Sequence, residues 1–298
     1  MNGPLRVSPE VADAIRARRP VVALETTLVA HGFPSGEGIA VGLESERRIR
    51  EAGAVPATVG VLDGAVRVGL DEDELGRFTE DARKVGPRDL AAAAEQGAVG
   101  ATTVGGTLAA CRAAGIGFMA TGGIGGVHRG ERFDVSADLG ELARTEALVV
   151  SSGVKSLLDV LATAELLETL GIPVLGFRTE ELPLFYTARG GPPVSARVES
   201  ADEAARVART HWALGRHSAL VLARPSEDGL DDVEPLIEEA LAAAEEQGLR
   251  GPAVTPFVLA QLHESSGGRT LEVNRELVAA NAALAAEVAL AFMRITSA

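Results

Sequence analysis

Along most of the chain, short apolar runs alternate with longer stretches in which apolar side chains recur every three or four positions. Short apolar runs are typical of buried β-strands, and the longer stretches are typical of helices with one apolar face. The predicted strands lie in Val21–Val29, Thr58–Val68, Phe118–Thr121, Ala147–Ser151, Val174–Phe177 and Ala219–Leu222. The predicted helices are Gly36–Ala52, Ser156–Leu170, Ala201–Ala213, Asp231–Gln247 and Leu271–Phe292. This alternation predicts an α/β fold with three layers, α/β/α, around a largely parallel central sheet.

One turn signal indicates that the sheet is mixed rather than purely parallel. In Thr58–Val68, two β-rich runs are joined by Asp63 and Gly64, a pair typical of the tight turn in a β-hairpin. Because a hairpin joins antiparallel neighbours, we expect a mixed, largely parallel sheet. No internal repeat, low-complexity tract or linker interrupts the pattern, which favours a single domain over residues 1–298.

Composition and charge exclude several classes of protein. The net charge is −14 and no basic stripe is visible, so neither nucleic acids nor anionic membranes are expected partners. No uninterrupted apolar run approaches the roughly 20 residues that span a membrane, and the N-terminus has no secretory apolar segment. The single cysteine, Cys111, excludes an internal disulfide and a multi-cysteine metal site. We therefore expect a cytoplasmic protein.

The basic residues are divided very unevenly between arginine and lysine. Of 28 such residues only two, Lys84 and Lys155, are lysines, and the other 26 are arginines. Arginine stays protonated, so it cannot replace lysine where an uncharged amine must act as a nucleophile. Two ordinary surface lysines would give the same count. The sequence around each lysine therefore has to distinguish a nucleophile from a surface residue.

Lys155 lies in the segment VVSSGVKSLLD, in which an apolar strand runs into Ser-Ser-Gly where the next helix is predicted to begin. The dipole at the start of a helix disfavours a cation, so an ordinary surface lysine gains nothing there. A lysine that is partly removed from water near other cations has a lowered pKa and can attack an electrophilic carbon. The sequence therefore predicts a nucleophilic Lys155.

Glu25 and Lys84 are further candidates, each with a structural alternative. Glu25 follows the apolar run Val21–Leu24, where a carboxylate costs free energy unless it is paired or functional. It is therefore predicted to be a general acid or base, or one half of a structural ion pair. Lys84 lies close to Arg83 and Arg88, which suits either a phosphate cradle or a solvated basic patch.

The segment TGGIGGVHRG, residues 121–130, lets the backbone approach a ligand closely. It is not a dinucleotide fingerprint, because His128 occupies the third glycine position, and neither lysine completes a P-loop. His128 and Arg129 add hydrogen-bond donors for an anion. In the following DVSAD, Asp134 and Asp138 could hold Mg²⁺ or Mn²⁺, while Ser136 or Asp138 could instead cap a helix.

Taken together, these segments resemble the pseudouridine-5′-phosphate glycosidase family, also called the indigoidine-synthase-A-like family. The similarity covers nearly the whole chain in the expected order. The matching stretches are VALETT, Lys84-Val-Gly, ATTVGGT, TGGIGGVHRG, DVSADL, VVSSGVKSLLD, LGFRTEELPLFY and TPFVLAQLHESSGG. One departure is visible, because the segment between His128 and Asp134 is shorter than is usual in the family.

The resemblance implies reversible cleavage of the C–C glycosidic bond of pseudouridine 5′-phosphate, which gives uracil and ribose 5-phosphate. It also implies a divalent cation, usually Mn²⁺ with Mg²⁺ or Fe²⁺ as substitutes, and a homotrimer. Carried onto this chain, Lys155 would be the covalent nucleophile, Glu25 the proton donor and Asp134 the metal ligand. The implied substrate contacts are Lys84, Val104, Thr121, His128, Ser136, Ala137, Asp138 and Asn274. Whether Asn274 or Asn281 reaches the site stays open.

The residue types suit this chemistry. Glycosidases that cleave bonds to oxygen or nitrogen use two carboxylates, but carbon C5 of uracil is a much poorer leaving group. An amine can stabilise the cationic carbon as a Schiff base, which a carboxylate cannot do. Two alternatives are a Schiff-base aldolase that acts on another sugar phosphate, and a catalytically silent ligand-binding protein. The aldolase needs no uracil pocket, and the binding protein would still bind its ligand after Lys155→Ala.

Overall fold

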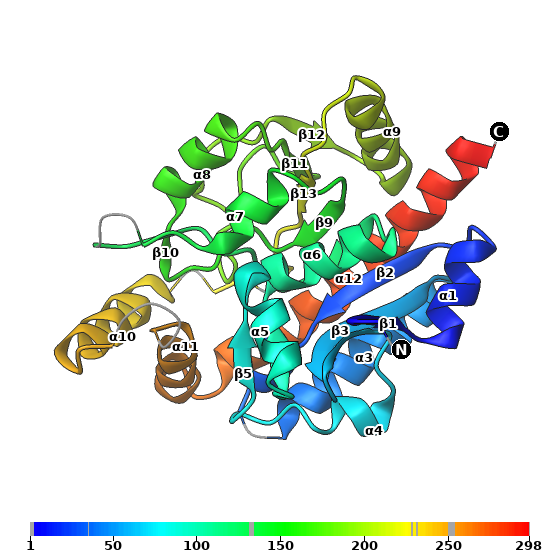
Figure 1. The fold of residues 1–298 in the computed structure, drawn as a ribbon. Coiled ribbons are helices and arrows are strands. Elements are labelled where there is room, and N and C mark those ends of the chain that lie inside the picture. Colours follow the sequence, from blue (N-terminus) through cyan, green and yellow to red (C-terminus); the bar gives the residue numbers. More distant parts are fainter. Residues whose placement is uncertain are drawn as a thin grey trace.

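The computed structural model describes residues 3–34, 36–130, 134–227, 229–230, 232–249 and 254–297, and its centre is an 11-stranded sheet (Figure 1). Its strands are β1 (Leu5–Val7), β2 (Val21–Glu25), β3 (Val55–Leu62), β4 (Ala65–Val68), β5 (Arg83–Val85), β6 (Gly100–Thr102), β7 (Phe118–Ala120), β9 (Leu148–Ser151), β11 (Val174–Phe177), β12 (Ala196–Val198) and β13 (Leu220–Ala223). The spatial order is β1-β4-β3-β2-β7-β9-β13-β11-β12, with β6 beside β3 and β5 beside β6. A separate antiparallel pair consists of β8 (Val127–His128) and β10 (Leu158–Asp159).

The sheet is mixed and largely parallel, as predicted. Strand β3 is antiparallel to β4 and β6, and the other pairs in this sheet are parallel. The predicted hairpin is the β3–β4 pair. Its turn residues Asp63 and Gly64 have φ angles of 50° and 72°, which is the left-handed region that a tight hairpin turn requires.

Helices cover both faces of the sheet, which confirms the predicted three layers. One face is covered by α3 (Glu37–Glu51), α9 (Ala201–Ala213) and α12 (Arg269–Ser297), and the other by α1 (Pro9–Arg16), α6 (Val104–Ala114) and α7 (Ala137–Leu142). The remaining helices are α2 (Thr27–His31), α4 (Glu72–Leu75), α5 (Leu90–Glu95), α8 (Val160–Thr169), α10 (Glu234–Glu246) and α11 (Val254–Ser265), with a 3₁₀ turn at Pro87–Asp89. Helices α10 and α11 pack against each other at one side of this three-layer arrangement (Figure 1).

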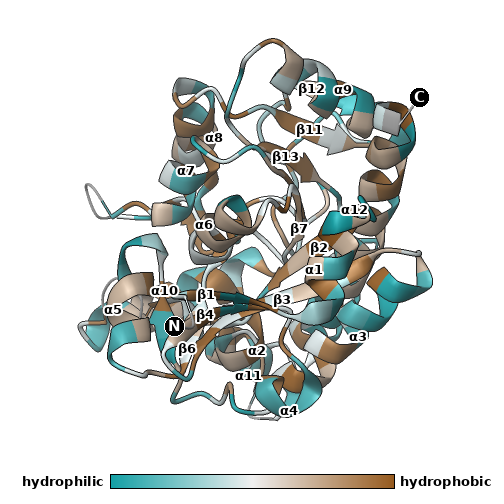
Figure 2. Ribbon diagram, turned by 45° about the vertical axis from the view of Figure 1, so that its right-hand side comes forward, coloured by the Kyte–Doolittle hydropathy of each residue, from teal (hydrophilic) through white to brown (hydrophobic). Residues whose placement is uncertain are grey.

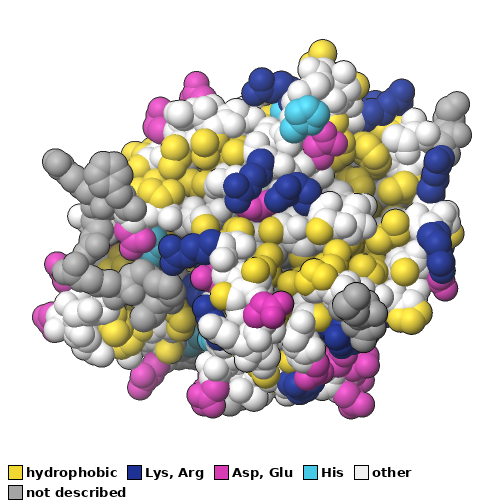
Figure 3. All heavy atoms as spheres, in the orientation of Figure 1, with side chains coloured by type: hydrophobic (Ala, Val, Ile, Leu, Met, Phe, Trp, Pro, Cys, Tyr) yellow, Lys and Arg dark blue, Asp and Glu magenta, His cyan; other side chains and the backbone are white. Residues whose placement is uncertain are grey.

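The central strands are apolar at successive positions because both faces of the sheet are buried. In β2, Val22 and Leu24 belong to the core cluster under α12, whereas Val21 and Ala23 belong to the cluster on the opposite face. Figure 2 shows the resulting pattern, in which the strands are hydrophobic and the outer faces of the helices carry the hydrophilic residues. On the face shown in Figure 3, Arg and Lys side chains lie scattered among acidic and uncharged ones.

Helix α12 is long and apolar enough, by length and composition, to cross a membrane. In the fold, however, 61% of the apolar window of this helix is buried. It packs against β2, β7 and β9 and against helices α3 and α9. Its apolar residues are therefore explained by the core of the α/β sandwich.

Two element boundaries matter for the site. Within Val21–Val29 the strand ends at Glu25, where the polar residues begin, and Thr27 starts helix α2. The helix predicted from Ser156 begins only at Val160, where the Asp159 side chain caps it by accepting a hydrogen bond from the backbone N–H of Ala162. For Asp231–Gln247, the described part of the helix is α10, and Asp231 lies outside the described residues.

Candidate active site

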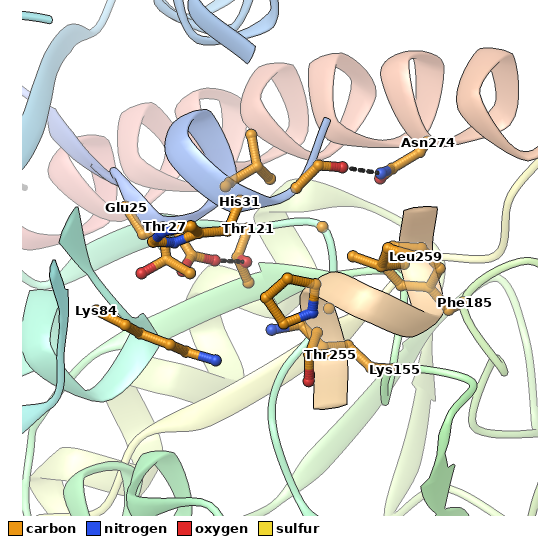
Figure 4. Close-up of a pocket in the computed structure, with 15 residues that line it drawn as sticks. Glu25, Thr27, His31, Lys84, Thr121, Lys155, Phe185, Thr255, Leu259 and Asn274 are labelled. Atoms are coloured by element: carbon orange, nitrogen blue, oxygen red, sulfur yellow. Dashed lines mark hydrogen bonds between the residues drawn. The ribbon is translucent and has the colours of Figure 1, made fainter. Parts of the chain in front are cut away.

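A cavity opens at the carboxyl ends of the neighbouring strands β2, β7 and β9, where ligands of α/β sheets commonly bind. Its empty volume, which includes space open to solvent, is about 450 Å³. The lining residues come from these strand ends, from the loop after β9, from β5, from the segment between β11 and β12, and from helices α2, α11 and α12: Glu25, Thr27, Leu28, His31, Gly32, Lys84, Thr121, Gly122, Gly123, Lys155, Phe185, Thr255, Pro256, Leu259 and Asn274 (Figure 4). The cavity thus brings together Glu25, Lys84 and Lys155.

Glu25 is the last residue of β2, and only 5% of its surface is exposed. Its carboxylate accepts a hydrogen bond from the hydroxyl of Thr121, the residue directly after β7 (Figure 4). Burial raises the pKa of the Glu25 carboxyl above its ordinary value and outweighs the opposing effects of Lys155, Thr121 and Lys84. A carboxyl that keeps its proton to higher pH is suited to act as a general acid.

Lys155 lies in a loop between β9 and β10, not at the start of a helix as the sequence predicted. The helix-dipole argument for this residue therefore fails. The loop is held instead by backbone hydrogen bonds, in which the Lys155 N–H donates to Ile124 O (3.2 Å) and the Ile124 N–H donates to Gly153 O (3.0 Å). Gly153 has φ = 84°, and a Cβ there would lie 1.9 Å from Pro183 O, so only glycine fits this close passage.

Lys84 is the central residue of β5, and its side chain reaches toward that of Lys155 across the cavity (Figure 4). Burial, followed by the positive charge of Lys155, lowers the pKa of Lys84 to about 8. The two neighbours considered with it point elsewhere. Arg83 donates to the Gln96 side chain (2.7 Å), and the Arg88 side chain is 89% exposed. Arg83 and Arg88 therefore do not join Lys84 at the cavity, whereas Lys84 itself is a half-buried cation of its lining.

Asp138 and its neighbours form the helix cap that was one of the two predicted interpretations. The Ser136 hydroxyl accepts from the Asp138 N–H (3.2 Å), and α7 begins at Ala137. The buried Asp138 carboxylate accepts from the N–H groups of Gly105 (2.7 Å) and Gly125 (3.0 Å). It therefore ties the first turn of α6 to the glycine-rich loop. Val104, Ser136, Ala137 and Asp138 do not belong to the lining of the cavity.

His128 and Asp134, both candidates from the sequence, lie outside the Lys155 cavity. Together they line a second cavity, whose other wall includes residues of α10. His128 Nδ1 is 3.9 Å from Asp134 Oδ2, and 30% of the Asp134 side chain is exposed. In the described part of the chain, no group of three or more His, Cys, Asp or Glu residues could hold a metal ion. Part of the shortened segment before Asp134, residues 131–133, lies outside the described residues.

The structure distinguishes the two candidate asparagines. Asn274 lines the cavity and its amide donates to Gly32 O (3.3 Å), while its buried Oδ1 has no hydrogen-bond partner among the described residues (Figure 4). Asn281 is fully buried, and its amide donates to Thr121 O (2.9 Å) and Ser152 Oγ (3.1 Å). Asn274 therefore faces the ligand space, whereas Asn281 joins the two strand ends that carry Thr121 and the Lys155 loop.

Several side chains that line the cavity were not predicted from the sequence to be functional. They are Thr27, Leu28, His31, Phe185, Thr255, Pro256 and Leu259. The motifs VALETT, LPLFY and TPFVLAQ contain or adjoin most of them, but those motifs entered only as evidence of resemblance. Phe185 carries a local sign of function that the sequence does not show, because its φ angle of 65° is unusual for a bulky residue.

Gly123→Ala is expected to disturb the cavity through Phe185. A Cβ on Gly123 would lie 2.6 Å from Phe185 Cδ2, so the ring must move. Because a misplacement of about 1 Å near reacting groups can cost about 10²-fold in rate, we expect up to that loss in turnover. Gly140→Ala is the control, since nothing lies within 4 Å of its Cβ. Equal turnover in the two variants would contradict a role for Phe185 in shaping the site.

Comparisons with known proteins agree with this site. A family model described as indigoidine synthase A like protein matches residues 10–291. Pseudouridine-5′-phosphate glycosidases are similar over nearly the full length. The protein from Streptomyces griseus is 49% identical, with 96% of this chain and 91% of its own covered. The protein from Escherichia coli K12 is 44% identical, with 98% and 96% covered.

Two solved structures share the fold. The prealnumycin C-glycosynthase AlnA, in complex with ribulose 5-phosphate, matches with a TM-score of 0.90 and 39% identity over 100% of this chain and 99% of its own. An indigoidine synthase A-like protein from Thermotoga maritima matches with a TM-score of 0.88 and 38% identity over 97% of both chains. The chain therefore belongs to the indigoidine synthase A-like family, as its sequence motifs predicted.

Proposed function

We propose that this protein reversibly cleaves the C–C glycosidic bond of pseudouridine 5′-phosphate to give uracil and ribose 5-phosphate. The observation that carries this proposal is the single cavity in which a lysine amine and a buried, proton-retaining carboxyl lie together, Lys155 and Glu25. Relatives that are 44–49% identical over almost the whole chain are named pseudouridine-5′-phosphate glycosidases. AlnA, which has the same fold, binds a five-carbon sugar phosphate.

We propose a covalent mechanism in which Lys155 forms a Schiff base. Glu25 gives its proton to the ribose ring oxygen while Lys155 Nζ bonds to C1′, and the ring opens. After the nitrogen loses a proton, its lone pair drives cleavage of the C1′–C5 bond, and uracil C5 takes up a proton. The C1′–nitrogen bond becomes a protonated imine, which water hydrolyses to release ribose 5-phosphate and the free amine. The lysine is suited to this route because nitrogen can stabilise a cationic carbon.

The other polar residues of the cavity suit binding roles. Lys84, half-buried on β5, supplies a positive charge for the phosphate while it is protonated. Asn274 Oδ1 is a buried acceptor with no partner in the part of the chain that the structure describes, which suits an N–H donor of the uracil ring. The apolar side chains of Leu28, Phe185 and Leu259 provide surface for a flat ring.

A divalent cation, Mn²⁺ with Mg²⁺ or Fe²⁺ as substitutes, is also part of the proposal. Asp134 would hold it, with His128 nearby. One partly exposed carboxylate without a cluster of protein ligands fits an ion that keeps most of its water molecules. When bound, such an ion would supply positive charge at the second cavity, which Asp134 and His128 line. No step above depends on it, and Asp134→Ala would test the binding directly by titration with Mn²⁺.

Two further properties are proposed from the family alone, a homotrimer and a cytoplasmic location. Sedimentation equilibrium of the purified protein would test the first of these. A mass close to that of one chain, 30.7 kDa, would contradict the trimer.

The proposal predicts uracil release from pseudouridine 5′-phosphate, followed as the separated free base and repeated with and without added Mn²⁺. Simple sugar phosphates that lack a base distinguish the main alternative, a Schiff-base aldolase, because that enzyme would cleave them. If sugar phosphates turn over while pseudouridine 5′-phosphate does not, the proposed function is wrong. Binding of the nucleotide without turnover of either compound would favour a silent binding protein.

A further inference from the structure

The loop that carries Lys155 is irregular backbone, so something other than secondary structure must hold the amine in place. Before Lys155, the loop is tied to Ile124 by the backbone bonds described above, and the Phe185 N–H donates to Ser152 O (3.0 Å). After Lys155, the Ser156 hydroxyl donates to Leu184 O (2.9 Å). A nucleophile has to be held within a fraction of an ångström of its productive position.

Arg129 makes a further attachment after Lys155. Its Nη2 donates to Ser156 O (2.8 Å) and its Nε donates to Leu158 O (3.2 Å). Its Nη1 donates to the Glu234 carboxylate in the first turn of α10 (2.7 Å). Arg129 directly follows β8, in which His128 pairs with Leu158 of β10. The guanidinium thus links the carbonyls of Ser156 and Leu158 to helix α10.

These contacts change the role that the sequence suggested for Arg129. All three guanidinium nitrogens already donate to protein oxygens, and only 32% of the side chain is exposed. The group is therefore committed to the loop rather than offered to an anion. Its rigid planar fork can reach two carbonyls and a carboxylate at once, whereas the compact ammonium of lysine on a flexible stem holds no such fixed geometry.

We infer that Arg129 is a positioning residue, which fixes the direction of the Lys155 amine by clamping the carbonyls of Ser156 and Leu158. The inference rests on the proposed function, because it assigns the clamp to the reaction of Lys155. Arg129 is not among the residues that line the Lys155 cavity, and instead lines the second cavity with His128 and Asp134. Its loss should therefore slow the covalent step and leave substrate affinity nearly unchanged.

The test compares Arg129→Ala and Arg129→Lys with Arg197→Ala, which removes an exposed arginine paired with Glu199. We expect both Arg129 variants to lower kcat for uracil release by up to about 10²-fold, with KM close to that of the unchanged protein. The rate at which borohydride and ribose 5-phosphate label Lys155 should fall by the same factor. Added methylguanidinium should restore part of the rate in Arg129→Ala, but not in Arg129→Lys, where the amine occupies the space.

An unchanged labelling rate in Arg129→Ala would overturn the inference, as would a rise in KM without a fall in kcat. If Arg129→Ala does not fold, the kcat and KM of Arg129→Lys decide the question. Absence of any label in the unchanged protein would instead contradict the covalent mechanism. In that case the kcat values of the Arg129 variants for uracil release would still test the clamp, so the two failures can be told apart.

Discussion

Lys155→Arg is expected to abolish uracil release, with a loss of at least about 10⁴-fold, as is typical when a catalytic nucleophile is removed. The substitution keeps a positive charge in the cavity, but a guanidinium stays protonated and cannot attack C1′. If Lys155 contributed only its positive charge, this variant would therefore keep its turnover. Steady-state uracil release is the measurement, and substantial turnover by Lys155→Arg would contradict the nucleophilic role.

The scarcity of lysine makes the matching chemical test unusually specific. With only Lys84 and Lys155 in the chain, borohydride reduction in the presence of ribose 5-phosphate can label few amines, and peptide mass spectrometry separates the two. We expect the label on Lys155. Lys84→Arg is the control, because it keeps the binding charge and leaves Lys155 unchanged. A label on Lys84 alone would show that Lys84, and not Lys155, is the nucleophile.

Glu25→Gln is expected to lower turnover by about 10²- to 10⁴-fold, the usual contribution of a general acid. Glutamine keeps the shape and can still accept from the Thr121 hydroxyl, but it has no proton to give to the ring oxygen. Glu46→Gln is a matched control. Burial also raises the pKa of Glu46, which accepts from Thr58 outside the cavity, so this variant should keep its activity.

Glu25→Gln should stabilise the folded protein at high pH, although it lowers turnover. The folded protein holds the Glu25 proton to higher pH than the unfolded chain does, because burial raises the pKa. This protonation favours folding at pH below the ordinary carboxyl pKa, and the benefit is lost as pH rises through the raised value. Glu25→Gln should therefore unfold at a higher temperature than the unchanged protein at pH 8, with a smaller difference near pH 4. A variant less stable at pH 8 would contradict the raised pKa.

The sequence by itself determined the family, the fold class and the identity of the main chemical groups. The spacing of apolar residues and the residue types at turns are local properties of a sequence. The β3–β4 hairpin and the layered α/β arrangement could therefore be predicted from them. The unusual lysine count drew attention to Lys155, and a carboxylate at the end of an apolar strand drew attention to Glu25. Both side chains line the same cavity.

Only the tertiary structure decided which of the other candidates lie with them. Lys84 and Asn274 reach the cavity from β5 and α12, whereas Asp134 and His128 line a different one. Such placement depends on how distant strand ends and helices pack, which no local pattern encodes. The predicted helix start before Lys155 failed for a related reason. Tertiary hydrogen bonds, including those from Arg129, hold Ser156 and Leu157 in a turn and Leu158 in strand β10, where the local pattern predicted a helix.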